Sequence, residues 1–252
     1  MTLALLAALV AVASPPRTMR VDYVHLGDAS GERFGLDRIV IEPLPWPGRP
    51  DRAVDDTGLG KYQVEIRDVA TSRLLYSRGF STVYGEWETT DEARRIQRAF
   101  QESVRFPAPD APFQVVLRKR DPRGGFREVW TLPVDPRDRA ITTARPASPG
   151  AVLELQKSGD PAQKLDLLFL GDGYTAAERG KFEKDARRLM AALFDKEPFR
   201  SRRADFNVWG LAPPAELGGV SRPLTGQHRW SRIGATYDAF GSERYVLSFE
   251  ER

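Results

Sequence analysis

The feature that most constrains the fold is a change in the spacing of apolar residues partway along the chain. From Met19 to about Pro136, apolar residues recur at every second position, as in a strand with one buried face. After residue 164, a continuous apolar run is followed by a glycine-rich turn and then by helical spacing. Two periods in one chain of 252 residues predict two domains of different class, each with a modest core.

The first region, residues 19–140, predicts an antiparallel β-sandwich. Tyr62, Val64 and Ile66 alternate with polar residues, and the Asp-Pro-Arg-Gly-Gly sequence at 121–125 joins two apolar runs as a hairpin turn would. Residues 43–60 are rich in proline and glycine and predict a long surface loop. The expected strands span residues 20–25, 38–43, 61–67, 74–80, 100–106, 113–119 and 126–132.

A short segment around Trp87 allows two interpretations. Glu86 and Glu88 flank this tryptophan, and two carboxylates beside an aromatic ring occur in the acid–base sites of glycosidases. In an extended strand, however, the two glutamates would share one face and Trp87 would occupy the other. A core tryptophan beneath two solvated carboxylates is therefore the favoured interpretation.

The second region begins after residues 141–163, which are rich in proline, alanine, serine and glycine and which we interpret as a linker. In residues 164–252, the run from Leu165 to Leu170 predicts a strand buried on both faces. Thr175 and Glu178 form a capping-box signature, and strands at 206–211 and 245–249 would follow the helix to give a β-α-β unit. The apolar stripe of that helix comprises Phe182, Ala186, Leu189, Met190, Leu193 and Phe194.

The turn at residues 171–176, Gly-Asp-Gly-Tyr-Thr-Ala, allows three interpretations. It fits a variant of the dinucleotide-binding fingerprint, but the next strand leads into Ala-Pro-Pro where a ribose-binding acid would be needed. As a tight turn, its glycines would adopt positive φ and Asp172 would bond backbone amides. As a ligand site, Asp172 and Tyr174 would line a cleft beyond the end of the strand. His228, in a polar stretch, is the third candidate for a contact with substrate or a structural ion.

The sequence lacks the residues of several kinds of catalytic site. It has no cysteine, which excludes disulfides and thiolate zinc sites and is compatible with export. His25 and His228 are the two histidines, and neither belongs to a His-Glu-x-x-His helix; His25 is expected to be a packed strand residue. No Gly-x-Ser-x-Gly elbow occurs. The sequence therefore shows no catalytic motif and no metal-ligand motif, although a Ser-His-Asp triad could assemble from distant positions.

Charge and the N-terminal segment bear on partners and location. The formal net charge is +3, but the basic residues are scattered among nearly as many acids, so nucleic-acid binding is not expected. Residues 1–13 predict a signal peptide, because an apolar run too short to cross a bilayer ends in Ala-Val-Ala before Ser-Pro-Pro. An apolar N-terminal helix is the alternative. We expect cleavage after Ala13, a secreted or periplasmic protein, and no membrane span after cleavage.

Several segments in order resemble the IgA-peptidase family of zinc metallopeptidases, family sixty-four. In the second region, the resemblance rests on residues 165–175, Phe194, Glu-Pro-Phe at 197–199, Phe-Asn-Val at 206–208, and residues 221–245. Residues 80–87, 102–107 and 126–130 resemble the β-sandwich domain that precedes the peptidase in this family. Together these segments cover nearly all of the chain after residue 13.

The resemblance implies an α+β protein, with an N-terminal antiparallel β-sandwich followed by an incomplete α/β (β-α-β) metallopeptidase domain. In this family, zinc is held by a His-Glu-x-x-His helix whose glutamate serves as general base, and the substrates are proteins or peptides. No residue here matches those ligands. The resemblance therefore implies the N-terminal portion of a secreted zinc peptidase, inactive as given, which is the favoured interpretation; a shortened relative that kept the fold elements and lost catalysis is the alternative. Zinc is expected for the complete enzyme.

A non-enzymatic exported module is the alternative function. In this hypothesis the β-sandwich would bind glycans or surface proteins, and Trp46, Trp87 and Trp130 would be exposed on it. The sequence leaves the oligomeric state open.

Overall fold

A computed structural model describes residues 16–143, 145, 147–243 and 245–248. The predicted signal peptide at residues 1–13 lies outside these described residues. The chain divides into two compact units, with residues 1–89 and 93–145 in the first and residues 90–92 and 146–252 in the second. Within the described part, no helix combines the length and hydrophobicity that a membrane crossing needs.

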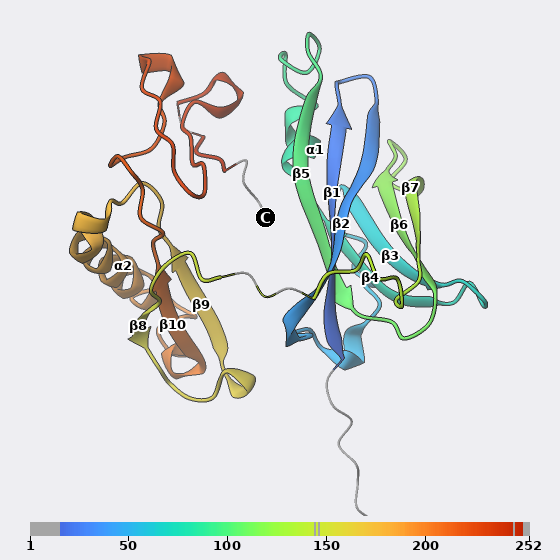
Figure 1. Cartoon of the computed structure of the whole chain (residues 1–252), viewed down its shortest axis with the longest axis horizontal. Helices are drawn as coiled ribbons and strands as arrows, with labels where there is room; N and C mark the ends of the chain where they lie inside the picture. The colour runs from blue at the N-terminus through green and yellow to red at the C-terminus, as the bar shows by residue number, and fades with distance from the viewer. Residues whose placement is uncertain (1–15, 144, 146, 244, 249–252) are drawn as a thin grey trace, which may run out of the picture. The chain divides into compact units, whose positions relative to one another are not determined.

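The first unit contains two antiparallel sheets and is called here the two-sheet unit (Figure 1). One sheet has the strand order β2-β1-β5 and the other β4-β3-β6-β7. The predicted strands are present with ends shifted by a few residues. The elements are β1 (Arg17–Gly27), β2 (Glu32–Pro45), β3 (Tyr62–Asp68), β4 (Leu74–Phe80), α1 (Val83–Trp87), β5 (Arg98–Pro107), β6 (Phe113–Arg120) and β7 (Phe126–Val134).

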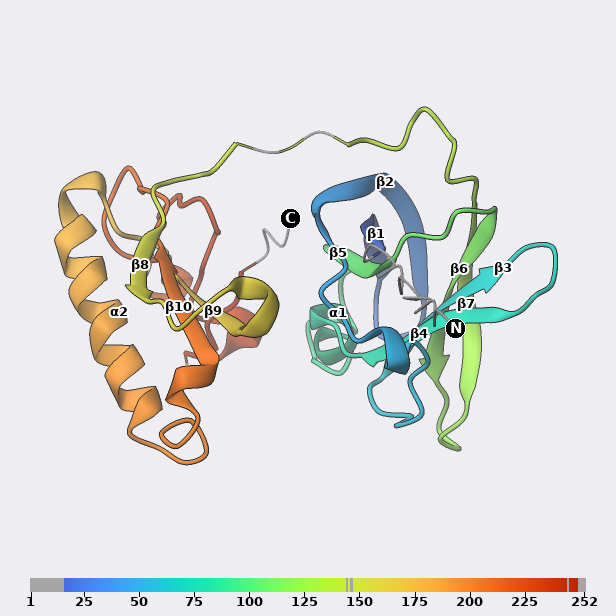
Figure 2. The ribbon, with the colours of Figure 1, turned by 90° about the horizontal axis from the view of Figure 1, so that it is seen from below.

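The strands of the two sheets are drawn from below in Figure 2. Side chains from both sheets form one core. Strand β1 contributes Val21 and Tyr23, β3 contributes Ile66, and β6 contributes Val115 and Leu117, all at most 1% exposed. These positions are two residues apart within each strand, which is the spacing that places side chains on one face. The sheet-rich α+β class predicted from the sequence is confirmed.

The segment around Trp87 is a helical turn, so the predicted strand-like alternation is wrong. Helix α1 begins after Thr82, whose hydroxyl accepts a hydrogen bond from the amide of Gly85 at 2.9 Å. Trp87 is fully buried, as the core interpretation requires. Glu88 is not solvated as predicted, because its side chain is 14% exposed and pairs with Lys119 at 2.8 Å.

The second unit contains a mixed three-stranded sheet and one long helix (Figure 1). Strand β9 (Leu165–Leu170) pairs in parallel with β10 (Phe206–Leu211), and helix α2 (Arg179–Phe194) connects them, which confirms the β-α-β unit. Strand β8 (Leu153–Gln156) pairs antiparallel with β10. The short 3₁₀ turns of the described residues are η1 (Pro50–Arg52), η2 (Pro161–Gln163), η3 (Ala176–Glu178), η4 (Arg203–Asp205), η5 (Pro223–Thr225) and η6 (Ala239–Gly241).

Strand β9 is not buried on both faces, which corrects the sequence-based expectation. The strand order β8-β10-β9 places it at the edge of the sheet. Leu167 and Phe169 pack against the cluster that contains Phe182 of α2, whereas Leu168 and Leu170 are 49% and 53% exposed. The apolar run therefore reflects one face packed against the helix and one face left open.

Two further expectations for this unit need correction. Leu189 was placed in the apolar stripe of the helix but is 46% exposed, whereas Phe182, Ala186, Met190 and Phe194 are buried. The strand predicted at 245–249 is not formed by the described residues 245–248, where Leu247 forms only an isolated bridge with Thr236.

A histidine with two carboxylate partners lies at the buried centre of the two-sheet unit. The side chain of His25 is 0% exposed, and its ring stacks between Tyr84 and Phe34 at centroid distances of 3.7 and 4.2 Å. Its Nδ1 lies 3.1 Å from Glu102 and its Nε2 lies 3.0 Å from Glu32. His25 is thus a packed residue, as expected, and its two ring nitrogens also form hydrogen bonds with two carboxylates.

Glu32 extends this network from one sheet to the other. Its carboxylate, on β2, accepts a hydrogen bond from the hydroxyl of Tyr62 on β3 at 2.7 Å and lies 3.1 Å from Nζ of Lys119 on β6. Lys119 also pairs with Glu88, which in turn pairs with Lys61. Three glutamates therefore face two lysines and one histidine, so a protonated His25 balances the charge of the cluster.

The charge states of His25 and Glu32 depend on each other. Burial lowers the pKa of His25, but the hydrogen bonds and negative charges of Glu102 and Glu32 outweigh it and raise the pKa above its ordinary 6.5. Burial raises the pKa of Glu32, but hydrogen bonds from His25 and Tyr62 and the charge of Lys119 bring it to about 2.

We predict that the stability of the two-sheet unit falls on both sides of a weakly acidic window. The contribution of His25 is complete below pH 6.5 and is lost as pH rises through its raised folded pKa, by at most about 1.4 kcal/mol per pH unit. The contribution of Glu32 is present above pH 4.5 and is lost as pH falls toward 2. Urea unfolding followed by tryptophan fluorescence between pH 2 and 9 measures both slopes.

His25→Gln should remove the alkaline slope, and His228→Gln should retain it because His228 is exposed. Equal alkaline slopes in the wild type and His25→Gln would contradict the assignment.

Candidate functional site

The candidate site begins at the carboxyl end of β9, where the chain turns into α2. The amide of Gly171 donates to the carbonyl of Leu211 at 2.8 Å, which keeps the turn at the end of β10. Gly173 has φ +72°, and a Cβ there would lie 2.5 Å from the carbonyl oxygen of Gly219. Glycine is therefore required at 173 both for backbone conformation and for space, as the tight-turn interpretation predicts.

The carboxylate of Glu178 accepts the hydrogen bonds of the residue that begins the helical segment, Thr175. Glu178 accepts hydrogen bonds from the amide and the hydroxyl of Thr175, each at 3.0 Å, which confirms the predicted capping box. These bonds hold the pKa of Glu178 below its usual range. A pyrophosphate at this helix start would meet a negative charge, so the structure does not favour the dinucleotide interpretation.

Asp172 ties this turn to a distant loop. Its Oδ2 accepts hydrogen bonds from the hydroxyl of Ser231 at 2.6 Å and from the amide of Ala235 at 2.9 Å. The amide of Ile233 lies 3.5 Å from the other carboxylate oxygen. Ser231 is 4% exposed, so the bond is shielded from water. Asp172 thus bonds backbone amides, as predicted for the turn, but those of residues some sixty positions away.

A cavity of about 430 Å³ lies next to this turn, and both Asp172 and Tyr174 line it. The structure thus brings together two of the three candidate residues. His228 is not among the lining residues, although its neighbours Gln227 and Arg229 are. Contact of Asp172, Tyr174 or His228 with a substrate stays a prediction.

The cavity also presents cations that the sequence did not single out as site residues. Lys181 pairs with Asp185 at 3.1 Å, and its Nζ lies 4.7 Å from the ring centre of Tyr174. Arg222 stacks over Tyr237 at 4.3 Å. The side chains of Arg222 and Arg229 form no ion pair with a carboxylate of the described residues, so their donors are available to an acceptor-rich ligand.

The described residues form no cluster of side chains that could hold a metal ion. Among the described residues, no group of three or more histidine, aspartate or glutamate side chains is placed to hold one. His25 is enclosed by Glu102 and Glu32 in the two-sheet unit. The described residues therefore do not provide the ligand set that a catalytic zinc ion needs.

We predict that Asp172 controls the order of the loop at residues 231–235. Asp172→Asn keeps the side-chain size but removes the charge that strengthens its bonds to Ser231 and Ala235, so the amide of Ala235 should exchange about tenfold faster. Hydrogen exchange measured by mass spectrometry over this loop tests the effect. Asp185→Asn is the matched control, because Asp185 bonds Tyr174 and Lys181, and it should leave the loop unchanged. Identical protection in both variants would show that Asp172 does not anchor the loop.

Comparison with known families covers both units. The profile described as Peptidase M64 N-terminus matches residues 12–131, and the profile described as IgA Peptidase M64 matches residues 153–252. No curated protein matches the chain. The matches follow one another in the order that the resemblance implied, with the candidate site in the peptidase segment. The chain therefore belongs to the M64 family of IgA peptidases, and this membership indicates a metallopeptidase.

Proposed function

We propose that this chain forms the leading part of an exported zinc metallopeptidase that hydrolyses peptide bonds in protein substrates. The observation that carries the proposal is the succession of the two family matches, residues 12–131 and then 153–252. Export is proposed from the apolar segment at residues 1–13, and the location would be secreted or periplasmic.

In this proposal, the second unit supplies part of the cleft that holds the substrate. Ligands of α/β sheets bind beyond the carboxyl ends of the strands, and the cavity at Asp172 and Tyr174 lies there on β9. The guanidinium groups of Arg222 and Arg229 would donate hydrogen bonds to carbonyl or carboxylate oxygens of a bound polypeptide. Asp172 would act by fixing the loop that borders this cleft, since its oxygens accept bonds from that loop.

The zinc-binding residues are proposed to come from sequence not contained in these 252 residues. The two histidines do not fit the role, because His25 is buried with Glu102 and Glu32, and His228 belongs to no metal-binding cluster of the described residues. A His-Glu-x-x-His helix must therefore be added before the protein can hydrolyse a peptide bond by this route. The chain as given would bind and orient, without catalysing.

The alternative of a tryptophan-based glycan platform is not favoured by the geometry. Trp87 is fully buried, and Trp130 stacks against Phe34 at 5.9 Å and packs on the core. Trp87 and Trp130 therefore do not provide the exposed, coplanar surface that the glycan-binding hypothesis requires.

We predict that the 252-residue chain neither retains zinc through dialysis nor cleaves unfolded protein substrates. A polypeptide extended along the same open reading frame to include a His-Glu-x-x-His segment should do both, and Glu→Gln in that segment should abolish cleavage while retaining zinc. Metal analysis and a casein digestion assay measure these outcomes. A stop codon directly after the codon for Arg252, or robust zinc-dependent cleavage by the chain as given, would contradict the proposal.

A further inference from the structure

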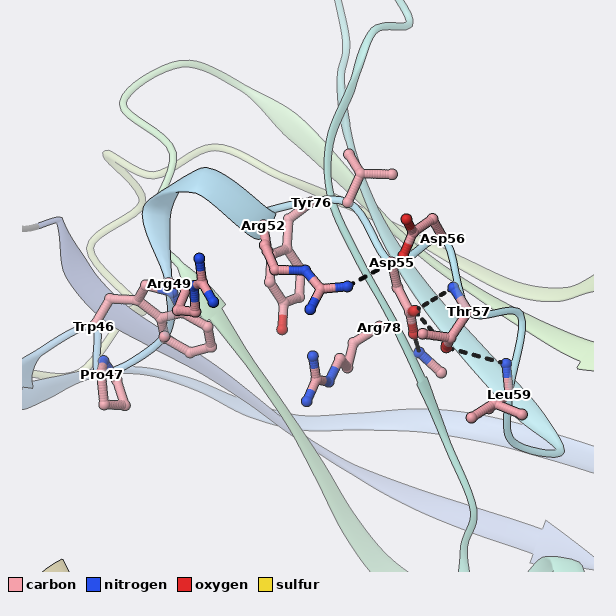
Figure 3. A pocket seen from close by; sticks show the side chains of 13 residues that line it. Trp46, Pro47, Arg49, Arg52, Asp55, Asp56, Thr57, Leu59, Tyr76 and Arg78 are labelled. Carbon is pink, nitrogen blue, oxygen red and sulfur yellow. Dashed lines mark hydrogen bonds and ion pairs between the residues drawn. The ribbon is translucent and has the colours of Figure 1, made fainter. Parts of the chain in front are cut away.

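Another, larger cavity lies in the two-sheet unit and is lined by residues of the loop after β2 and of strand β4. It has a volume of about 710 Å³, within the range of cavities that enclose small ligands or peptide segments. Figure 3 shows Trp46 on one side of it, the segment from Asp55 to Leu59 on the other, and the side chains of Arg52 and Arg78 between them.

The wall of this cavity is fixed by bonds between the loop after β2 and strand β4. Asp55 accepts hydrogen bonds from the amide of Gly79 at 2.7 Å and from the hydroxyl of Thr57 at 2.6 Å. The amide of Asp55 donates to the hydroxyl of Ser77 at 2.9 Å. A Cβ at Gly79 would lie 2.0 Å from the carbonyl oxygen of Leu59, so only glycine allows this close approach. The cavity is therefore preformed rather than assembled by a ligand.

Two of the arginines that line the cavity have no strong carboxylate partner, although the carboxylates of Asp55 and Asp56 also line it. Arg78 forms no ion pair among the described residues, and the contact of Arg52 with Asp56 is long, at 3.5 Å, and exposed. Tyr76 is 7% exposed, yet its hydroxyl has no hydrogen-bond partner in the described part of the chain. The carboxylate of Asp55 already accepts three hydrogen bonds, so it is not free to pair fully with Arg78.

The pKa shifts of Tyr76 and Asp55 agree with the position of Arg78 beside them. Burial raises the pKa of Tyr76, and the positive charge of Arg78 acts in the opposite direction on the same hydroxyl. Hydrogen bonds from Thr57 and Gly79, with a smaller effect of Arg78, hold the pKa of Asp55 below its ordinary value. Arg78 is thus close to both groups, and its guanidinium, which forms no ion pair with the described residues, offers hydrogen-bond donors to a ligand in the cavity.

We propose that this cavity binds an acidic segment of the polypeptide substrate, with Arg78 and Arg52 pairing to its carboxylates and Tyr76 donating a hydrogen bond. Guanidinium groups form bidentate ion pairs with carboxylates, so they suit the side chains of aspartate and glutamate. The inference rests on the proposed function, because a peptidase acts on polypeptides and a second contact outside the catalytic unit would add to substrate affinity.

The aromatic side chain of the cavity supports a peptide over an acidic sugar. Trp46 is half-buried, borders the core of the unit, and packs edge-on against Tyr76 at an interplanar angle of 87°. A sugar ring needs an open aromatic face, whereas a peptide carboxylate needs only the donors.

Binding of a short acidic peptide to the 252-residue chain tests the inference directly. The probe is an acetylated and amidated hexapeptide of alternating aspartate and glutamate, and its asparagine–glutamine counterpart is the neutral control. Calorimetry at low salt should show binding of the acidic peptide only, and added salt should weaken it. Arg78→Gln should weaken binding about tenfold, since a charge-assisted pair is lost, and Arg78→Lys should lose less.

Arg123→Gln is the matched control, because Arg123 is an exposed arginine of the same unit in the β6–β7 turn. Arg78 is itself exposed and has no carboxylate partner in the described part, so its variants should melt at the wild-type temperature. Equal binding of the acidic and neutral peptides, or equal losses in Arg78→Gln and Arg123→Gln, would overturn the proposal.

Two other outcomes would also overturn the assignment to a polypeptide. Tighter binding of oligogalacturonate than of the acidic peptide would make this a glycan site, and equal competition by inorganic phosphate would make it a simple anion site. The readout requires no zinc and no cleavage. A failed binding test therefore leaves the peptidase proposal standing, and a failed cleavage test leaves the binding result standing.

Discussion

The two-sheet unit depends on a buried ionic network in which Glu32 is the common member. Apolar side chains hold the two sheets together along most of the core. At Glu32, however, the contact between the sheets is made by charged and polar groups. His25 on β1 bonds Glu32 on β2 and Glu102 on β5, so it spans all three strands of its sheet. Tyr62 and Lys119 then bring two strands of the opposite sheet to the same carboxylate. Removing one member would leave buried charge without its counterion, which is more costly than losing an apolar contact of similar size.

The features that the sequence predicts correctly are those that depend on local interactions. The capping box of Thr175 and Glu178 spans three residues, and the strands from Leu74 to Phe80 and from Phe206 to Leu211 are set by composition and by the turns around them. The tight turn with positive φ at Gly173 was predictable for the same reason. Each of these features is determined by residues a few positions apart, which a single sequence displays.

The features that the sequence does not predict are those that depend on residues far away in the chain. The exposure of Leu168 and Leu170 follows from strand order, which places β9 at a sheet edge and is not encoded in its own residues. The helical turn at Trp87 was missed because alternation in so short a segment also fits a capped turn. In the candidate site, Asp172 and Tyr174 came from the turn motif, whereas Arg222 and Arg229 reach the cavity through loop geometry that no spacing rule predicts. The metal ligands could not be placed because the residues described contain no such set.

The loop that forms the larger cavity has a second consequence for the protein in solution. Strand β4 is the last strand of its sheet, and an uncovered last strand offers amides and carbonyls that another chain can pair with. Here the amide of Ser77 donates to the carbonyl of Ala53, and the amide of Gly79 donates to Asp55. The loop therefore occupies the groups through which two molecules would join edge to edge. The wall of a binding cavity and a barrier against aggregation are, in this protein, the same few hydrogen bonds.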